Sequence, residues 1–595
     1  MRQVSVSDRA ATGATNSTDA TKRLFSYMQP YRTRLIIIAV LVILYNILNV
    51  IGPYLIGVAI DQYIEVGDLA GLGQIALWMT AVYISMWIAG AIYGRMMAKV
   101  AQNTLQQIRA DLFSHMQRLS LSYYDQRSAG DLMSRLTNDI DAVNQLLSQN
   151  LITFLSSLTS LIGLLIAMLL LNGWLTLATL LVLPIMFGTV ALLSKRTGPA
   201  FRELQMQLGS LNGLMEENLS GQRVVIAYGQ QGASLDEFTA VNNAARDAGI
   251  TANVIAGLMM ALMFVLGNMN VAVVAGLGAW MAVTGFAGIT VGVITTFINY
   301  SRQFGRPLMQ IAGLFNSILA ALAGAERIFE VLDTQPALAD KPNAQPLDAI
   351  TGEVIFKGVD FSYLAGEPIL KKLSFDAKPG EMIALVGPTG AGKTTIINVL
   401  THFYDIDAGN IWIDGQEIRD VQVDSLRGQI GVVLQDTFLF ADTVMENIRY
   451  GRLDATDAEV IEAAKLANAD SFVSRLPDGY HTMLSERAGN LSQGQRQLLT
   501  IARTILENPR ILILDEATSS VDTRTEVQIQ QALLTLMAGR TSFVIAHRLS
   551  TIREADQILV LKDGELIEQG SHEQLLADGG FYNNMFLSQF KGQLL

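Results

Sequence analysis

A glycine-rich stretch ending in Lys and Thr is the clearest chemical motif in this sequence. It reads GPTGAGKTT from Gly387, directly after an apolar run and before a helix-like segment. Glycines allow such a loop to curl so that backbone N–H groups face phosphate oxygens, and the start of the next helix adds its dipole. The motif predicts a nucleotide-phosphate site formed by Gly387, Pro388, Thr389, Gly390, Ala391, Gly392, Lys393, Thr394 and Thr395.

Two acids at the end of a second apolar run complement this loop. Residues 511–514 read ILIL, which is typical of a strand buried in a parallel sheet, and Asp515 and Glu516 follow at its carboxyl end. Lys393 would place its charge on the β- and γ-phosphates, and Thr394 and Asp515 are suited to hold Mg²⁺. Glu516 can polarise an attacking water. The two motifs together predict hydrolysis of a magnesium-bound nucleotide.

Composition indicates that this site belongs to a chain with a membrane part. The 595 residues are 50% hydrophobic and only 16% charged, which is too long for one domain and too apolar for a wholly soluble protein. The net charge of -12 gives no support for nucleic-acid binding, and the absence of cysteine excludes disulfides and thiolate-bound metals.

Six long apolar runs each predict a transmembrane helix, because each is near or above the roughly 20 residues needed to cross a bilayer. Lys and Arg gather before the first run and in the two long connections, whereas the three short loops opposite contain neither. The positive-inside rule then places both termini and both long connections in the cytoplasm, where the connections should continue as helices. The runs are 35–60, 74–98, 146–171, 174–193, 255–283 and 288–315.

The composition changes at about residue 334. Prolines among Asp, Ala and Lys mark a linker, after which short β-rich runs alternate with helical ones. We therefore expect a multidomain chain, in which an all-α six-helix transmembrane domain precedes an α/β P-loop nucleotide-binding domain. The expected limits are a flexible tail at 1–20, the transmembrane domain at 21–333, the linker at 334–349 and the nucleotide-binding domain at 350–595.

These motifs make the chain resemble a half-transporter of the ATP-binding cassette (ABC) exporter family over residues 20–590. The resemblance implies ATP and Mg²⁺ as cofactors, and hydrolysis coupled to transport by a pair of half-transporters. It also implies that Tyr363 stacks on adenine and that Gln435 contacts Mg²⁺. His547 would touch the γ-phosphate, and Asp522 would belong to a loop that communicates across the dimer. His547 follows an apolar strand, so it should emerge at the same sheet edge as the acidic pair.

In this family an LSGGQ segment of one subunit closes over the ATP held by the other. Here the segment reads LSQGQ, so Ser492, Gln493, Gly494 and Gln495 would face the partner's nucleotide and a long side chain occupies the first glycine position. One interpretation is tolerance of Gln493 in an ordinary homodimer. The other is asymmetry, because LSQGQ beside an intact acidic pair resembles the catalytic-glutamate subunit of heterodimeric bacterial multidrug ABC exporters. The partner would then carry an intact LSGGQ and a degenerate glutamate.

Other residues are candidates for coupling and for substrate contact. Two regions resemble the family's coupling regions, which turn nucleotide-driven closure into helix movement: residues 122–125 with 130–135, and residues 209–223. Arg302 and Arg306, one helical turn apart, are the best cavity candidates for a lipid headgroup or an anionic drug, although the same residues could snorkel to the cytoplasmic interface. Four methionines offer an adaptable apolar surface, or simply pack between helices: Met259, Met260, Met263 and Met269.

The predicted function is ATP-driven export of amphipathic molecules, drugs or lipids, across a bacterial cytoplasmic membrane. The protein would be multi-pass, with both termini and the nucleotide-binding domain in the cytoplasm. Its expected partners are a second half-transporter, the lipid bilayer and the amphipathic substrate, with no nucleic acid. A homodimeric lipid or peptide exporter and a regulatory membrane ATPase without transport are the alternatives.

Overall fold

The chain folds as two compact units. The computed structural model describes residues 17–336, 340–347, 349–364, 366–434, 437–485, 488–515, 522–546 and 549–590. The described residues divide between one unit within Met1–Gln117 and Gly130–Asp333 and a second within Arg118–Ala129 and Thr334–Leu595. The first unit is helical, and the second contains both β-sheets of the described chain.

Six helical stretches of the first unit are long and apolar enough to cross a membrane, as the sequence predicts. They are Thr18–Ile64, Leu69–Met116, Ala129–Leu171, Gly173–Ser220, Gln231–Val283 and Val291–Asp333. Their elements are α2 (Ser17–Met28), η1 (Gln29–Tyr31), α3 (Arg32–Val58), η2 (Ala59–Ile64), α4 (Leu69–Met116), α6 (Ala129–Ser134), η3 (Arg135–Asp139), α7 (Ile140–Gln145), η4 (Leu146–Asn150), α8 (Leu151–Leu171), α9 (Gly173–Ser220), α10 (Gln222–Ala227), α11 (Gln231–Val283), η5 (Phe286–Gly288) and α12 (Val291–Asp333).

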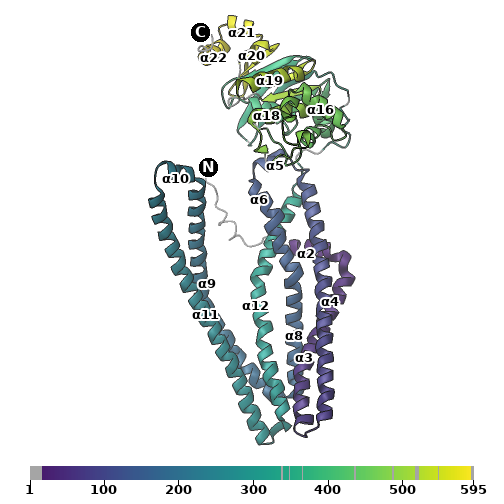
Figure 1. Cartoon of the computed structure of the whole chain (residues 1–595), viewed down its shortest axis with the longest axis vertical. Coiled ribbons are helices and arrows are strands. Elements are labelled where there is room, and N and C mark those ends of the chain that lie inside the picture. Colours follow the sequence, from purple (N-terminus) through teal and green to yellow (C-terminus); the bar gives the residue numbers. More distant parts are fainter. Residues whose placement is uncertain are drawn as a thin grey trace. The chain divides into compact units, whose positions relative to one another are not determined.

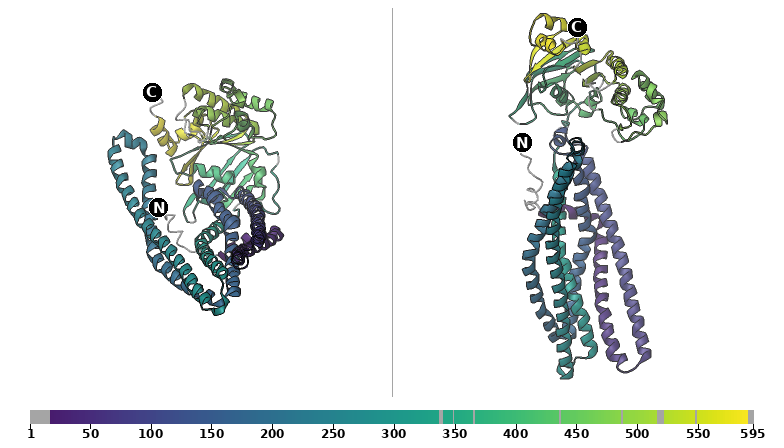
Figure 2. Two further views of the ribbon diagram at one scale, coloured as in Figure 1. Left: turned by 60° about the horizontal axis from the view of Figure 1, so that its bottom comes forward. Right: turned by 60° about the vertical axis from the view of Figure 1, so that its left-hand side comes forward.

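These helices extend well beyond the thickness of a bilayer. The 48 residues of α4 or α9 span about 72 Å at ~1.5 Å per residue, against a hydrocarbon core of about 30 Å. The two long connections are therefore helical, as expected. In both Figure 1 and Figure 2, α9 and α11 run side by side and α10 closes their hairpin at its tip. Apolar side chains of α10, Val224 and Ile226, are more than half exposed at this tip.

Short polar contacts fix the opposite ends of the helices. Asp68 caps α4 by accepting hydrogen bonds from the backbone N–H groups of Ala70 and Gly71, both at 3.0 Å. Asp61 in η2 accepts from the N–H of Gly292 at 2.7 Å, at the start of α12. These caps satisfy N–H groups that have no partner inside their own helix.

Close packing explains one intramembrane asparagine. The Asn46 side chain is buried and donates to the Thr159 hydroxyl of α8 at 2.7 Å. A Cβ added at Gly57 of α3 would lie 2.7 Å from the carbonyl oxygen of Gly292 in α12, so these two backbones approach closely because glycine occupies the contact. The hydrogen bond from Asn46 to α8 thus also serves helix packing.

The second unit joins a mainly parallel sheet to a smaller antiparallel one. The larger sheet has the order β10-β9-β3-β8-β7-β6, and the smaller has the order β2-β1-β4-β5. Their strands are β1 (Val354–Ser362), β2 (Pro368–Ala377), β3 (Met382–Val386), β4 (Ala408–Ile413), β5 (Gln416–Glu417), β6 (Ile430–Val433), β7 (Ile511–Asp515), β8 (Thr541–Ile545), β9 (Gln557–Lys562) and β10 (Glu565–Gly570). Phe375 of β2 and Phe543 of β8, with ring centroids 6.2 Å apart, lie in the shared apolar core of the two sheets.

Helices surround the sheets of this unit. The helices are α13 (Lys393–Leu400), η6 (Ile418–Asp420), α14 (Val423–Arg427), α15 (Val444–Arg449), α16 (Asp457–Leu466), α17 (Asp470–Val473), η7 (Gly479–His481), α18 (Gln493–Glu507), α19 (Thr523–Met537), α20 (Leu549–Glu554), α21 (His572–Ala577) and α22 (Phe581–Phe590). The α/β architecture confirms the predicted fold of the C-terminal part. Part of the expected linker packs on it, because Leu347 is buried in its core and Gln345 pairs with Val421.

A short helix from the N-terminal half of the chain belongs to this unit. Helix α5 (Leu121–Asp125) overlaps the first segment that resembles a coupling region, residues 122–125. The Tyr404 hydroxyl donates a hydrogen bond to the Asp125 carboxylate, and burial together with this bond raises the pKa of Tyr404. The Arg127 guanidinium lies 4.0 Å from the centroid of the buried Tyr123 ring. Segment 118–129 is thus anchored to the nucleotide-binding fold.

Candidate active site

Strand register brings the carboxyl ends of the strands before the predicted site residues together at one edge of the larger sheet. Leu385 of β3 pairs with Ile545 of β8, and Ile545 in turn pairs with Asp515 of β7. All three strands are parallel, so their carboxyl ends lie at the same edge. The glycine-rich loop follows β3, and Asp515 ends β7, with only β8 between them. This edge is therefore the candidate nucleotide site.

Three glycines give the loop a backbone shape that other residues rarely adopt. The φ angles of Gly387, Gly390 and Gly392 are 153°, 84° and 101°. A Cβ on Gly387 would lie 2.2 Å from the carbonyl oxygen of Leu561, whereas one on Gly390 would meet nothing within 4 Å. Positive φ is costly for residues with a Cβ. The loop thus has the glycine-dependent curvature of a phosphate cradle, which fits a bound nucleotide.

Lys393 begins α13 and points back into this loop. Its Nζ donates to the carbonyl oxygens of Gly387 at 2.7 Å and Pro388 at 2.9 Å. Burial lowers the pKa of Lys393, and the negative charge of Asp515 opposes that shift. The ammonium group is held where the helix N-terminus also attracts anions. Thr394 is exposed beside it, while Thr395 is buried.

The aromatic residue expected to stack on adenine lies next to α13. The Tyr363 hydroxyl donates to the Thr395 hydroxyl at 3.3 Å and accepts from the Asn398 amide at 2.8 Å. Its ring packs edge-on against Phe361 and Tyr404. Tyr363 remains 40% exposed, which leaves surface for a ligand. Stacking on adenine stays a prediction.

The LSQGQ segment forms a capped helix start. Ser492 is the N-cap of α18: its hydroxyl accepts from the N–H of Gln495 at 3.3 Å, and the Gln495 side chain accepts from the N–H of Ser492 at 2.9 Å. This reciprocal pair is a capping box. Gln493 is the first residue of the helix and has no positive φ, and Gly494 is buried behind it. Gln493 therefore fits the backbone of its own chain without strain.

An arginine that the sequence analysis did not single out holds the turn before this helix. Arg496 donates to the carbonyl oxygens of Leu491 at 2.9 Å and Ala488 at 3.4 Å. These bonds tie the turn before the LSQGQ segment to the first part of α18, so they hold that turn in place. Its place directly after the motif was the only signal in the sequence, and a basic residue near the start of a helix is not favoured by the helix dipole.

Several predicted site residues lie outside the described residues. They are Gln435, Glu516 and His547. Asp522 is described: it is exposed and caps α19, accepting from the N–H groups of Arg524 at 3.2 Å and Thr525 at 3.0 Å. These hydrogen bonds lower the pKa of the Asp522 carboxyl. The structure thus brings the loop, Lys393 and Asp515 together.

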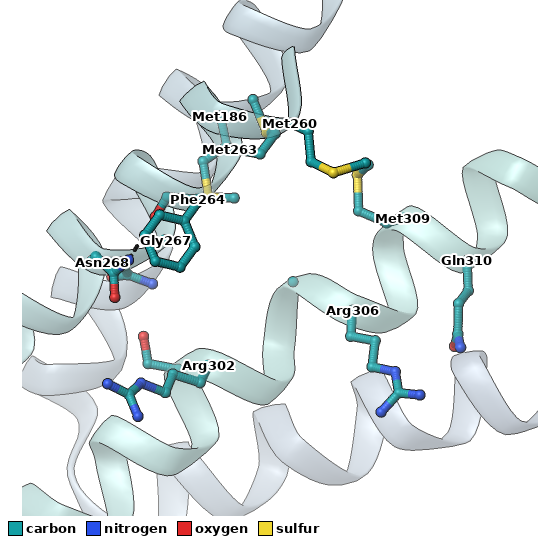
Figure 3. Close-up of a pocket in the computed structure, with 13 residues that line it drawn as sticks. Met186, Met260, Met263, Phe264, Gly267, Asn268, Arg302, Arg306, Met309 and Gln310 are labelled. Atoms are coloured by element: carbon teal, nitrogen blue, oxygen red, sulfur yellow. Dashed lines mark hydrogen bonds between the residues drawn. The ribbon is translucent and has the colours of Figure 1, made fainter. Parts of the chain in front are cut away.

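The helical unit contains a separate cavity of about 940 Å³ between α9, α11 and α12. Figure 3 shows Met186, Met260 and Met263 on one side of it and Met309 on the other, with Arg302 and Arg306 on α12. Of the predicted methionine surface, Met260 and Met263 line the cavity, but Met259 and Met269 are not among its lining residues. The remaining lining residues are Phe264, Gly267, Asn268, Asn270, Ser301, Gly305 and Gln310.

Comparison with known proteins identifies the class of protein that combines these two units. Residues 35–308 match the model of the ABC transporter transmembrane region, and residues 370–519 match the ABC transporter model of the ATP-binding domain. The chain therefore belongs to the ABC transporter family, and it is an exporter-type half-transporter. Proteins of this kind bind ATP, couple its hydrolysis to transport and act as dimers in a membrane.

Individual relatives match nearly the whole chain. The uncharacterized ABC transporter ATP-binding protein YfiC of Bacillus subtilis is 44% identical, with 96% of this chain and 94% of that protein covered. A fatty acid ABC transporter ATP-binding/permease protein of Mycobacterium tuberculosis is 43% identical, with 87% and 82% covered. The solved structure of a bacterial Atm1-family ABC exporter with ATP bound has a TM-score of 0.75 and 32% identity, with 94% and 98% covered.

Proposed function

We propose that this chain is one half of a heterodimeric exporter that moves amphipathic small molecules, drugs or lipids, out across the bacterial cytoplasmic membrane. The observation that carries the proposal is Gln493 at the first position of α18, inside an otherwise intact capping box. The helix start is preserved, and only the surface that would face a partner's nucleotide is altered. The chain's own phosphate loop and Asp515 are meanwhile intact and aligned.

This combination supports an unequal pair of ATP sites. Gln493 has no positive φ angle, so it does not strain the backbone of its own chain. The longer side chain would instead hinder the close approach of backbone N–H groups to the γ-phosphate of the partner's nucleotide, an approach that glycine permits. The partner would supply an LSGGQ segment to this chain's nucleotide and would lack an equivalent glutamate. One site would then hydrolyse ATP quickly and the other slowly.

At the fast site each residue of this chain has a proposed role. ATP would supply the reactive γ-phosphoryl group, and Mg²⁺ would offset its negative charge. Lys393 would hold the β- and γ-phosphates, and Thr394, Gln435 and Asp515 would hold Mg²⁺. Glu516 would accept a proton from the attacking water, and His547 would contact the γ-phosphate. The remaining nucleotide contacts are assigned to Tyr363, Gly387, Pro388, Thr389, Gly390, Ala391, Gly392 and Thr395, and those to the partner's nucleotide to Ser492, Gln493, Gly494, Gln495 and Asp522.

Membrane orientation follows from the charges around the spans. In the loops that join the spans, Lys and Arg are confined to one side, so we place both termini and the nucleotide-binding domain in the cytoplasm. The proposed domain limits are 21–333 for the transmembrane domain and 350–595 for the nucleotide-binding domain. In this arrangement α5 docks on its own nucleotide-binding domain, and the exposed apolar side chains of α10 suit the partner's.

Transport in proteoliposomes tests the amphipathic substrate. The chain is purified together with the half-transporter that accompanies it in its native membrane and is reconstituted with the nucleotide-binding domains outward. A fluorescent lipid analogue and a hydrophobic dye should each accumulate inside on addition of MgATP. Hydrolysis of ATP without movement of either probe would favour the alternative, a regulatory membrane ATPase.

A further inference from the structure

The cavity between α9, α11 and α12 is lined by two positively charged side chains, and the apolar spans contain no acidic residue to balance them. Positions 248–325 contain no Asp, Glu or Lys, and their only arginines are Arg302 and Arg306. Positions 35–60, 69–94 and 142–194 contain no charged residue. Within the described part of the chain, neither guanidinium has a hydrogen-bond or ion-pair partner. The chain itself thus supplies no counter-ion at this depth.

Helix geometry places these charges far from the outer end of the span. Helix α12 begins at Val291, so Arg302 lies about 16 Å and Arg306 about 22 Å along it at ~1.5 Å per residue. The hydrocarbon core is about 30 Å thick, which puts Arg302 near the middle of the bilayer. An intramembrane charge at that depth is costly unless it faces a partner or a water-filled cavity. Both arginines line the cavity.

Two buried polar groups beside them also lack partners. Ser301 is 6% exposed and Asn270 is 4% exposed, and both line the same cavity. The Ser301 hydroxyl and the Asn270 side-chain carbonyl oxygen have no hydrogen-bond partner among the described residues. Buried polar atoms in native proteins are nearly always paired. These two residues add unsatisfied polar atoms to the end of the cavity where the arginines lie.

The rest of the cavity is apolar and adaptable. Met186, Met260, Met263 and Met309 contribute thioether side chains, and Phe264 contributes a ring (Figure 3). Methionine suits surfaces that adjust to ligands of varied shape. The volume of about 940 Å³ lies within the range of about 300–1,000 Å³ found for small-molecule sites. One cavity thus combines an unbalanced cationic pair with an apolar wall.

We propose that this cavity selects an anionic amphiphile with one oxyanion headgroup, a carboxylate or a phosphate ester, which pairs with Arg302 and Arg306 while its hydrocarbon tail lies against the methionines. Guanidinium groups suit both headgroups because their planar N–H forks bind two oxygens at once. The inference rests on the proposed export of amphipathic molecules and narrows it to one charge class. The anion supplies the counter-ion that the spans lack.

Binding to the intact assembly in nanodiscs of phosphatidylcholine tests the proposal. Radiolabelled hexadecanoate is competed by hexadecanoate, hexadecyl phosphate, hexadecanol and hexadecyltrimethylammonium, which share one tail. We expect either anion to compete at least about tenfold better than the alcohol or the cation, because charge-assisted hydrogen bonds are made to the anions alone. The double variant Arg302→Gln, Arg306→Gln should remove that preference, and Arg302→Lys, Arg306→Lys should retain part of it.

Arg95→Gln is the matched control. Arg95 is an exposed arginine of α4 that does not line the cavity, so its loss should leave both the anion preference and the basal ATPase unchanged. Equal competition by all four amphiphiles in the wild type, or an unchanged anion preference in the Gln double variant, would overturn the proposal. Binding is measured without turnover, so a failure here is distinct from absence of ATP-driven transport, which would defeat the proposed function instead. Carboxylate and phosphate headgroups are told apart by their separate competition curves.

Discussion

Replacing Glu516 with Gln is expected to lower the ATP turnover of the assembled transporter by about 10²-fold or more, the usual size of a general-base contribution. Gln keeps the size of the side chain but cannot accept the proton of the attacking water. Because the other ATP site is proposed to be slow, this change in one chain should abolish almost all ATP turnover of the assembly. Binding of ATP should survive, since Lys393 and the glycine loop are untouched.

Turnover and ATP binding are measured on the same preparation, with Glu554→Gln as the control. Glu554 is an exposed residue at the end of α20, so this variant removes a carboxylate of the same domain without touching the site. If Glu516→Gln retained half or more of the wild-type turnover, the single fast site would be contradicted. That result is expected for two equally active sites, because the partner's own glutamate would still serve the second site.

Replacing Gly387 with Ala should cost the chain most of its affinity for ATP, a loss of at least about tenfold. The new methyl group would lie 2.2 Å from the carbonyl oxygen of Leu561, which is backbone at the end of β9 and cannot rotate away. The loop must therefore move, and with it the carbonyl that accepts from Lys393. Its φ of 153° adds a further backbone cost.

Gly390→Ala distinguishes the effect of backbone strain from that of a steric clash with the added methyl group. Its φ is 84°, but its Cβ would meet nothing within 4 Å, so only the dihedral cost of about 1–2 kcal/mol applies. Without nucleotide, Gly387→Ala should therefore melt several degrees below Gly390→Ala, as monitored by thermal unfolding of the full chain. Equal melting temperatures and wild-type ATP affinity for Gly387→Ala would show that the close packing at Leu561 does not hold the loop.

Local sequence patterns were enough to predict most of the fold. The six apolar runs predict the six spans because crossing a bilayer requires a length that little else in the chain reaches. Glycine spacing predicts the loop after β3, and the run before Asp515 predicts β7, because both signals lie within a few neighbouring residues. The predicted places of Glu516 and His547 remain predictions.

Contacts between distant segments could not be read from such patterns. Tyr404 and Asp125 are 279 positions apart, and only folding shows that α5 belongs to the C-terminal unit. The alignment of β3, β8 and β7 likewise depends on crossover connections. The cavity draws on three helices, and of the four methionines singled out in α11 only Met260 and Met263 are among its lining residues. Each of these features depends on packing that no single stretch encodes.

Expressing this chain alone and purifying it shows whether it needs an unlike partner, when both the mass of the assembly and its ATPase rate are measured. We expect only low residual hydrolysis, because every composite site would then be closed by Gln493 in place of glycine. A homodimer that hydrolyses ATP as fast as the native assembly would contradict it, and the exporter would then be symmetric.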